Sequence, residues 1–195
     1  MARAGGEILG ERHLPLGDER VEALVEAVRA SEPGFVLNNL VGASSYAFLR
    51  AMAALGRRDA RFAPSRCPIL SCNLTECELP MLGPAAEGLI SAGPYFGSSS
   101  FEEAARLSVL SLARRAAAAG PDAPLPALLA APDGGALAID PVTRHAALPA
   151  LIARVEGGVF RVLERREAAP ADPYLVRTPR PAPLARPRPR LVAAR

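Results

Sequence analysis

The first 95 residues carry two hydrophobic patterns, one typical of amphipathic helices and one typical of short buried strands. Between Asp18 and Pro33, apolar residues recur at intervals of three and four, which predicts a helix with Asp18 as its N-cap. Two further helices are expected to open near Gly42 and, at capping-box spacing, at Thr75 and Glu78. Short apolar runs predict strands at residues 7–16, 35–37, 68–72 and 88–92. Strands and helices in this order, with such short connections, predict a parallel sheet covered by helices on both faces.

The second half of the chain is rich in alanine and proline. Ser100 and Glu103 have capping-box spacing and begin an alanine-rich helix, expected to end at Gly120, whose apolar arc is broad enough to lie on the sheet. Four prolines predict mainly loop at residues 121–133. Further strands are expected at residues 137–139, 151–155 and 159–163, the last two joined by a turn at Gly157-Gly158. The predicted fold class is α/β: one three-layer lobe with a mostly parallel sheet, a late β-hairpin and a disordered tail.

Charge divides the chain near residue 176. Residues 1–176 hold 17 arginines against 20 acidic residues, a net charge of −3, whereas residues 177–195 hold six arginines and no acid, a net charge of +6. We therefore expect a folded lobe at residues 1–176 and a flexible tail rich in arginine and proline at residues 177–195. The tail has no interleaved aromatic residues on which bases could stack, so no direct nucleic-acid binding is expected.

The N-terminus and the apolar runs bear on location. No run approaches the roughly 18 apolar residues of a membrane span, so membrane insertion is not expected. Glu7 interrupts the N-terminus before the apolar part of a signal peptide. As written, the chain is expected in the cytoplasm, and in the periplasm if an upstream lobe carries a signal.

Residues that often carry catalysis or bind metals are few. His13 and His145 lie far apart, and the C-x4-C-x4-C spacing of Cys67, Cys72 and Cys77 differs from that of structural zinc sites. The chain has no phosphate-binding loop, dinucleotide-binding motif or serine-hydrolase motif. The sequence thus predicts a protein that is not an enzyme and uses no metal or cofactor. A competing hydrolase hypothesis depends on Cys72, at a strand end where a helix dipole would favour the thiolate.

The loops that follow the predicted strands are the remaining candidate site. In open parallel sheets, ligands bind beyond the carboxyl ends of the strands, where loops and helix N-termini present free N–H groups. Here these loops are rich in Gly, Ser, Asn and Thr, which either cap helices in the ordinary way or bind a small polar ligand. The ligand-binding candidates are Asn39, Val41, Gly42, Ser44, Asn73, Thr75, Glu76 and Tyr95.

Six groups of short segments, in the same order, resemble the amide- and urea-binding branch of the type I periplasmic binding proteins. They are residues 36–42 with 44–50, residues 68–71 with 75–76, residues 87–88, residues 94–96, residues 131–135 with 139–141 and His145, and residues 172–175. The resemblance covers residues 6–176. It implies the second, C-terminal lobe of a non-enzymatic protein whose two lobes close on a short aliphatic amide or urea.

The resemblance implies two alternative roles. One is a cytoplasmic amide sensor that restrains an antitermination regulator and so regulates aliphatic amidase expression. The other is the extracytoplasmic substrate-binding subunit of a urea or short-amide ABC transporter, which would work with an ABC permease. A further hypothesis is a remnant lobe that acts only as a protein-interaction module and self-associates through an exposed inter-lobe face.

The chain departs from this family in two respects. The resemblance begins at the strand that opens the second lobe, so the first lobe is missing from this sequence, and half a cleft cannot enclose a ligand. After Phe96 the chain runs almost directly into Glu103, without the additional helix of the family, and Arg106 stands where the family has an aromatic residue. Tight ligand binding is therefore expected only when a second lobe is supplied.

Overall fold

The structure, a computed structural model, describes residues 6–98, 106–135, 137–140, 142–169 and 172. Its helices and strands are, in chain order, α1 (Glu22–Ser31), β1 (Val36–Asn38), α2 (Gly42–Arg58), β2 (Ile69–Ser71), α3 (Leu79–Leu82), β3 (Ile90–Gly93), α5 (Ser111–Ala119), α6 (Leu125–Ala130), β4 (Leu148–Glu156) and β5 (Val159–Ala169). Short 3₁₀ turns lie at Ala60–Phe62, Glu76–Glu78 and Gly83–Ala86, and a π-helical turn at Arg106–Leu110 precedes α5.

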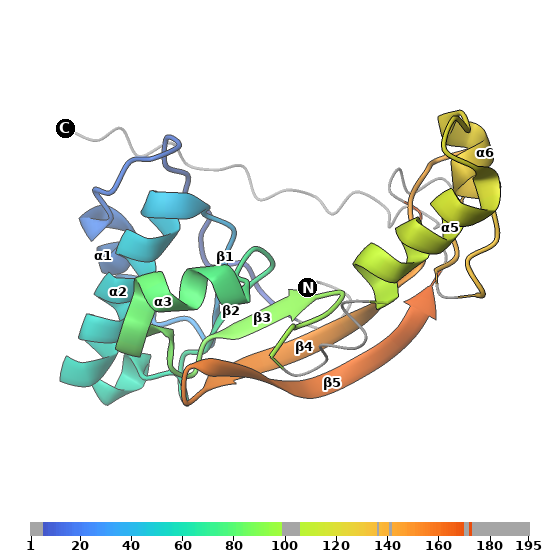
Figure 1. The fold of residues 1–195 in the computed structure, drawn as a ribbon. Helices are drawn as coiled ribbons and strands as arrows, with labels where there is room; N and C mark the ends of the chain where they lie inside the picture. Colours follow the sequence, from blue (N-terminus) through green and yellow to red (C-terminus); the bar gives the residue numbers. More distant parts are fainter. Residues whose placement is uncertain (1–5, 99–105, 136, 141, 170–171, 173–195) are drawn as a thin grey trace.

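The molecule has two parts joined by a long hairpin (Figure 1). We call residues 6–98 together with β4 and β5 the sheet body. We call residues 106–135 and 137–140 the α5–α6 unit. The unit lies at the far end of the β4–β5 hairpin, away from α1, α2 and α3 (Figure 1).

One five-stranded sheet runs through the sheet body in the order β1-β2-β3-β4-β5. β1, β2 and β3 are parallel, whereas β4 is antiparallel to both β3 and β5. Gly157 and Gly158 join β4 to β5 with φ angles of 61° and 79°, a left-handed conformation that favours glycine and matches the twist of a tight hairpin. The predicted α/β fold class, with parallel strands in its first half and a late hairpin, is confirmed.

The core of the sheet body lies where α2 packs against the sheet. α2 buries Phe48, Leu49 and Met52, and the Phe160 ring of β5 lies 4.5 Å from the Phe96 ring, centroid to centroid. Burial of each such side chain contributes about 1.5–3 kcal/mol to folding. β4 buries every second residue and exposes the residues between them. The predicted cover of helices on both faces of the sheet therefore does not hold for β4.

The helix predicted to lie on the sheet has a different position. α5 ends at Gly120, as predicted, but it packs on α6 at the far end of the hairpin rather than on the sheet (Figure 1). The reason is the chemistry of its buried side. Ser111 and Arg115 are buried and form hydrogen bonds with residues of the segment from 129 to 137, so this face closes against α6 and its following loop.

Several local predictions need correction. Residues 7–16 form no strand, and residues 137–139 contribute only an isolated bridge from Ile139 to Ala146. α1 begins at Glu22 rather than after Asp18, because its first backbone hydrogen bonds go to the Val21 carbonyl oxygen. The Asp18 carboxylate accepts hydrogen bonds from Arg20 in the turn before the helix. The Ser100–Glu103 capping box and residues 177–195 lie outside the described residues.

Candidate ligand-binding wall

Three loops that follow the parallel strands form one edge of the sheet. β1 is followed by residues 39–41, β2 by residues 72–75, and β3 by residues 94–98. Because parallel strands end on the same side, the three loops lie next to one another. We call this surface, with the first turns of the helices that follow, the carboxyl-edge wall. It includes every ligand-binding residue predicted from the sequence.

A row of buried polar side chains lies beneath the wall. Asn38 pairs with Ser71 in the sheet, Ser71 pairs with Ser91, and all three are buried. The Asn38 side chain donates from Nδ2 to Ser45 Oγ at 3.0 Å and accepts from the Leu40 backbone N–H at 3.2 Å. This one amide therefore connects the end of β1 to the first turn of α2.

The two serines of the row fix the second loop. Ser71 Oγ accepts from the Asn73 backbone N–H at 3.2 Å, and Ser91 Oγ lies 2.7 Å from the Leu74 carbonyl oxygen, to which it donates. A buried polar group without a hydrogen-bond partner would reduce the stability of the fold by about 1–3 kcal/mol. The hydrogen bonds of these serines therefore keep the loop in place. Sequence reasoning missed this row. Its signal was available, since each otherwise apolar strand carries one polar residue: Asn38 and Ser71 at the ends of β1 and β2, and Ser91 within β3.

Hydrogen bonds also join neighbouring loops of the wall. Asn73 Nδ2 donates to the Asn39 carbonyl oxygen at 3.3 Å. Glu76 Oε1 accepts from the Ser98 backbone N–H at 3.3 Å and lies 3.4 Å from the Ser98 hydroxyl. The structure thus joins Asn39 to Asn73, and separately joins Glu76 to the third loop. Ser98, which was not a candidate from the sequence, completes the link between the second and third loops.

The predicted capping box holds Thr75 at the start of its helical turn. The Thr75 backbone N–H donates to Glu78 Oε2 at 2.8 Å, which confirms the pair. Glu78 Oε1 in turn accepts from the Tyr46 hydroxyl of α2 at 3.2 Å. Desolvation, together with the nearby Glu78 carboxylate, raises the pKa of Tyr46, so the phenol stays protonated and keeps this hydrogen bond. α2 is therefore bonded to the loop that carries Thr75.

The N-terminus of α2 opens onto the same wall. Val41 occupies the N-cap position without a side-chain cap, and the first turn holds no acidic residue. Gly42 has a φ of 57°, a conformation that a residue with a Cβ rarely adopts. Ser44 is only 2% exposed, and its Oγ has no hydrogen-bond partner among the described residues. Its hydroxyl thus lies beneath the surface of the wall and not on it.

The outer side of the wall is open. Asn39, Val41, Asn73 and Thr75 are exposed, and Tyr95 is 39% exposed with a phenol that makes no hydrogen bond within the described residues. Two hollows in the described part of the chain lie elsewhere, one of about 410 Å³ at residues 32–34, 60–62 and 66 and one of about 550 Å³ in the α5–α6 unit. Within the described residues, the wall is therefore an open surface and not an enclosed pocket.

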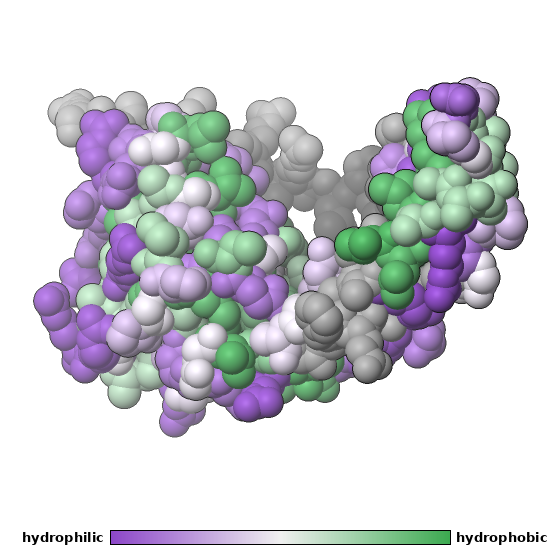
Figure 2. Space-filling model, in the orientation of Figure 1, coloured by the Kyte–Doolittle hydropathy of each residue, from purple (hydrophilic) through white to green (hydrophobic). Residues whose placement is uncertain are grey.

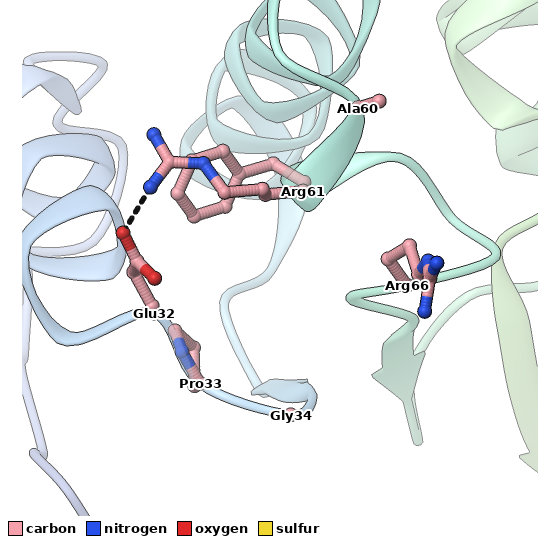
Figure 3. Close-up of a pocket in the computed structure, with 7 residues that line it drawn as sticks. Glu32, Pro33, Gly34, Ala60, Arg61 and Arg66 are labelled. Atoms are coloured by element: carbon pink, nitrogen blue, oxygen red, sulfur yellow. Dashed lines mark hydrogen bonds and ion pairs between the residues drawn. The ribbon is translucent and has the colours of Figure 1, made fainter.

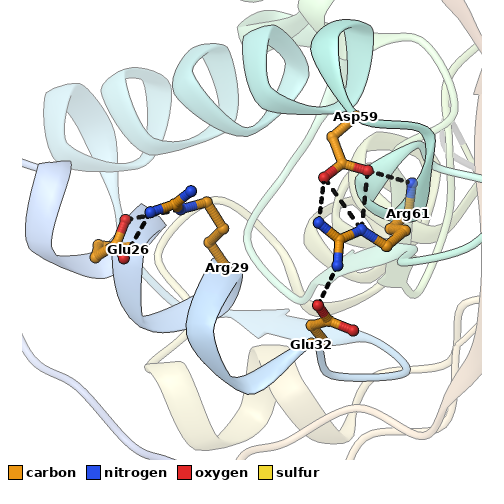
Figure 4. A network of polar contacts seen from close by, with 5 residues as sticks. All are labelled: Glu26, Arg29, Glu32, Asp59 and Arg61. Carbon is orange, nitrogen blue, oxygen red and sulfur yellow. Dashed lines mark hydrogen bonds and ion pairs between the residues drawn. The ribbon is translucent and has the colours of Figure 1, made fainter.

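The first hollow lies at the wrong end of the sheet for a ligand site of this fold. Its lining residues precede β1 and β2, so it is at the amino ends of the parallel strands (Figure 3). Arg61 lines this hollow and pairs with Glu32 of the α1–β1 turn and with Asp59, at 2.7 Å between Arg61 Nη2 and Asp59 Oδ2 (Figure 4). Hydrogen bonds from Arg61 lower the pKa of Asp59. These pairs connect α1 to the turn after α2.

The cysteines and histidines form no catalytic group in the described residues. Cys67 is buried, which raises the pKa of its thiol, whereas Cys72 and Cys77 are exposed. His145 Nδ1 lies 2.6 Å from the Thr143 carbonyl oxygen. Within the described ranges, no three or more His, Cys, Asp or Glu side chains gather as a metal site would require. Among the helices of the described residues, none is long and apolar enough to cross a membrane.

Comparison with solved structures supports the assignment of the fold. One similar structure is a solute-binding protein of an ABC transporter from R. palustris in complex with benzoate, with a TM-score of 0.64 and 18% identity over 88% of this chain and 54% of that chain. Another is a putative branched-chain amino acid ABC transporter from Rhodospirillum rubrum, with a TM-score of 0.55 and 20% identity over 83% of this chain and 54% of that chain. This chain therefore spans about half the length of either structure. No curated protein matches it.

The family follows from the sequence match. A family model described as a periplasmic binding protein domain matches residues 1–118, which is more than half of the chain. The resemblance to periplasmic binding proteins is thereby confirmed, while the amide- and urea-binding branch stays a prediction. This chain belongs to the periplasmic binding protein family.

Proposed function

We propose that this chain is a non-enzymatic solute-binding protein whose carboxyl-edge wall binds a short aliphatic amide or urea. One observation carries the proposal: exposed amide and hydroxyl groups from adjacent loops are fixed by hydrogen bonds on one open surface. Asn73 offers both a donor and an acceptor, Thr75 offers a hydroxyl, and the α2 N-terminus offers backbone N–H groups. An amide or urea carries a carbonyl acceptor and N–H donors, and so matches this mixed set.

The charge of the wall favours an uncharged ligand. Its loops at residues 39–44, 72–75 and 94–98 contain no arginine, so a carboxylate ligand would meet no side-chain counter-ion there. The two carboxylates of the turn after the second loop are already used: Glu76 accepts from Ser98, and Glu78 accepts from Thr75 and Tyr46. A neutral ligand avoids the cost of burying an unpaired charge when a second lobe closes over it.

The biological role is a separate part of the proposal. We infer a ligand sensor that restrains an antitermination regulator of aliphatic amidase expression. The alternative role, substrate binding for an ABC permease, is favoured by the two solved structures, since both are described as parts of ABC transporters. Amide-dependent binding to an antitermination regulator would support the sensor, whereas amide-dependent binding to a permease would support the transporter.

NMR titration of the 195-residue chain tests the proposed ligand class. Acetamide, butyramide and urea at millimolar concentration are expected to shift backbone resonances of residues 39–42 and 73–76. Asn73→Ala combined with Thr75→Val should abolish these shifts, because it removes the side-chain hydrogen-bonding groups of the second loop. Ser31→Ala, at the exposed end of α1, is the control.

Benzoate and leucine serve as competing ligands in the same titration. Larger shifts with either one would show that the ligand class is wrong. An absence of shifts at the wall with every ligand, in folded protein, would exclude binding by this chain alone.

A further inference from the structure

The hydroxyl group of Thr75 is held from one side by Glu78. Glu78 Oε2 accepts from the Thr75 backbone N–H at 2.8 Å and from the Thr75 hydroxyl at 3.4 Å. An ionised carboxylate only accepts hydrogen bonds, so the hydroxyl proton of Thr75 points toward Glu78. Thr75 is exposed, whereas Glu78 is half-buried. On the open side of the carboxyl-edge wall, the Thr75 oxygen is therefore a hydrogen-bond acceptor and not a donor.

Tyr46 keeps the Glu78 carboxylate in this position. The Tyr46 hydroxyl donates to Glu78 Oε1 at 3.2 Å, so the two carboxylate oxygens have separate partners. One oxygen is bonded to α2 and the other to the loop that carries Thr75. Turning the carboxylate away would break the hydrogen bonds on both sides. Glu78 therefore holds the direction of the Thr75 hydroxyl.

Asn73, two residues before Thr75, also presents an acceptor. Its amide nitrogen Nδ2 donates to the Asn39 carbonyl oxygen at 3.3 Å. Because a carbonyl oxygen can only accept, the nitrogen must face Asn39, and the side-chain oxygen Oδ1 faces the other way. The Asn73 side chain is exposed, and no described residue donates to its Oδ1. The second loop thus offers Thr75 as an acceptor only, and Asn73 as an acceptor with one remaining N–H.

The N-terminus of α2 presents the opposite polarity. Its first backbone N–H groups have no partner within the helix, no side chain caps them, and the first turn contains no acidic residue. Ser44 in this turn is only 2% exposed, and its Oγ has no hydrogen-bond partner among the described residues. Asn39, which contacts Asn73, lies two residues before the N-cap residue Val41. The donors of α2 and the acceptors of the second loop are therefore adjacent on the wall.

Hydrogen-bonding groups dominate the choice of a ligand at this end of the molecule. In the view of Figure 2, hydrophilic and hydrophobic residues are interspersed over the α1–α3 end, whereas hydrophobic residues gather over α5. A small ligand of the wall meets donors and acceptors of fixed direction and not one broad apolar patch. A site built to pair with an N–H group rejects an analogue that lacks this group, because the acceptor is then left without a partner.

We propose that Glu78 is a positioning residue for ligand selection: by holding the Thr75 hydroxyl proton, it makes Thr75 an acceptor that requires an N–H group on the ligand. The wall then binds a primary amide in one direction. The carbonyl oxygen of the ligand lies at the α2 N-terminus, and its –NH₂ group lies at Thr75 and Asn73. Because the same wall is involved, the inference rests on the proposed function. It assigns the selectivity to a side chain that does not touch the ligand.

The first test needs no ligand. The exchange of the Thr75 hydroxyl proton with water is measured by NMR at low temperature, from the isotope effect on the Thr75 Cβ resonance in mixed H₂O and D₂O. We expect exchange in Glu78→Leu to be at least about tenfold faster than in the unchanged chain, because water replaces the carboxylate. Glu78→Gln should exchange slowly, since its side-chain oxygen still accepts. Equal exchange in the unchanged chain and in Glu78→Leu would overturn the inference.

The second test measures ligand selection with acetamide and acetone. These two ligands share their shape and carbonyl group and differ only in –NH₂ against –CH₃. NMR titration of residues 39–42 and 73–76 should give at least about tenfold tighter binding of acetamide than of acetone to the unchanged chain. Thr75→Val and Glu78→Leu should each lower this ratio to below about threefold, because the acceptor is lost or turned. Thr75→Ser and Glu78→Gln keep the acceptor and should retain the ratio.

The remaining variants separate selection from loop structure. Thr75→Val keeps the hydrogen bond from the backbone N–H to Glu78, so it tests the inference even where Glu78→Leu disturbs the loop. Cys77→Ser, an exposed change in the same turn, is the control and should change neither exchange nor selection. A loop role that is only structural would weaken both ligands alike and leave the ratio unchanged.

The outcomes for this inference and for the proposed function differ. An absence of acetamide-dependent shifts in the unchanged chain excludes the proposed function, and this selection with it. Acetamide binding with a ratio near one, or with a ratio that Thr75→Val leaves unchanged, overturns the inference alone.

Discussion

The sheet body and the α5–α6 unit reach a fixed shape by opposite means. The sheet body buries aliphatic and aromatic side chains between α2 and the sheet and confines most of its buried polar groups to one edge. The α5–α6 unit buries an arginine and an aspartate and leaves Val109, Leu110, Leu112 and Leu125 exposed. A segment of about 35 residues has too little apolar interior to fold on burial alone. Satisfied buried charges can order such a segment while several of its apolar side chains stay exposed.

The same contrast separates two kinds of surface. The carboxyl-edge wall presents exposed amides, hydroxyls and backbone N–H groups, which suit a small polar ligand. The exposed side of α5 presents Leu112 and alanine side chains, which have no hydrogen-bonding groups. One chain thus carries a polar surface at the carboxyl edge of its sheet and an exposed apolar surface on α5.

The largest effect is expected from breaking the buried ion pair. Arg115→Met leaves the Asp133 charge without its partner, and such a loss costs about 3–5 kcal/mol. Amides of residues 106–135 should lose hydrogen-exchange protection, while those of the sheet body keep theirs. Arg114→Met is the control, because Arg114 makes a single 3.3 Å hydrogen bond to the Asp133 carbonyl oxygen. Equal loss of protection in both parts would show that they unfold as one unit.

A core truncation should produce the reverse pattern. Leu49→Ala removes a fully buried side chain from the α2 face, which typically costs about 2–5 kcal/mol. Hydrogen exchange should become faster in the sheet body and stay unchanged in the α5–α6 unit. Leu16→Ala, at an exposed position, should change neither part. A large effect of Leu49→Ala on the unit would argue against independent stability.

The buried polar row can be tested by one pair of neighbouring substitutions. Asn38→Ala leaves the Ser45 hydroxyl and the Leu40 N–H without their partner, and the expected cost is about 1–3 kcal/mol in urea unfolding. Asn39→Ala should cost much less, since its side chain is exposed and only its carbonyl oxygen is used. Equal costs for the two substitutions would contradict a special role for the row.

The smallest effect is expected from pH. Hydrogen bonds from Arg20 lower the pKa of Asp18 from 3.8 to about 2. A depressed pKa in the folded state means that the contribution of Asp18 to stability is present above pH 3.8 and is lost as the pH falls toward 2. The difference in thermal midpoint between the chain and Asp18→Asn should therefore shrink over that interval. A constant difference would show that the Arg20 contact does not persist in solution.

Asp133 allows the same comparison in the other part of the molecule. Its pKa is also lowered, chiefly by the hydrogen bond from Ser111, with backbone N–H groups and Arg115 contributing further. Protection of the α5–α6 unit should thus fall as the solution is acidified below the ordinary pKa of an aspartate. Protection that is insensitive to acid in this unit would argue against an ionised Asp133.

The sequence predicted the sheet body better than the α5–α6 unit, for a physical reason. In the sheet body, local patterns and tertiary packing agree, so the apolar runs became β1, β2 and β3, and Thr75 and Glu78 formed their capping box. In the unit, an apolar arc on α5 suggested packing on the sheet. The buried side of α5 proved to be the one with Ser111 and Arg115. These two side chains form hydrogen bonds with residues distant in the sequence, whereas no described element packs on the apolar side of the helix.

The candidate site was predicted at the level of loops and less well at the level of side chains. Strand order alone indicated which loops would meet, because the carboxyl ends of parallel strands share an edge. Ser44 proved buried, and Ser98 proved to be the link to Glu76. Residue spacing could predict neither the burial of Ser44 nor the contact of Ser98 with Glu76. Both depend on how closely each loop packs on the next one.

The pairing of β3 with β4 makes the α5–α6 unit a topological insertion. Gly93 pairs with Leu151 across two antiparallel strands that are direct neighbours in the sheet, so a plain turn could join them. The chain instead leaves the sheet after β3, builds a helical pair, and returns to the adjacent position. The chain therefore crosses between the two parts twice, once after β3 and once before β4. No single cut can separate them, whereas one deletion that joins residue 98 to residue 148 would yield a continuous sheet body without the α5–α6 unit.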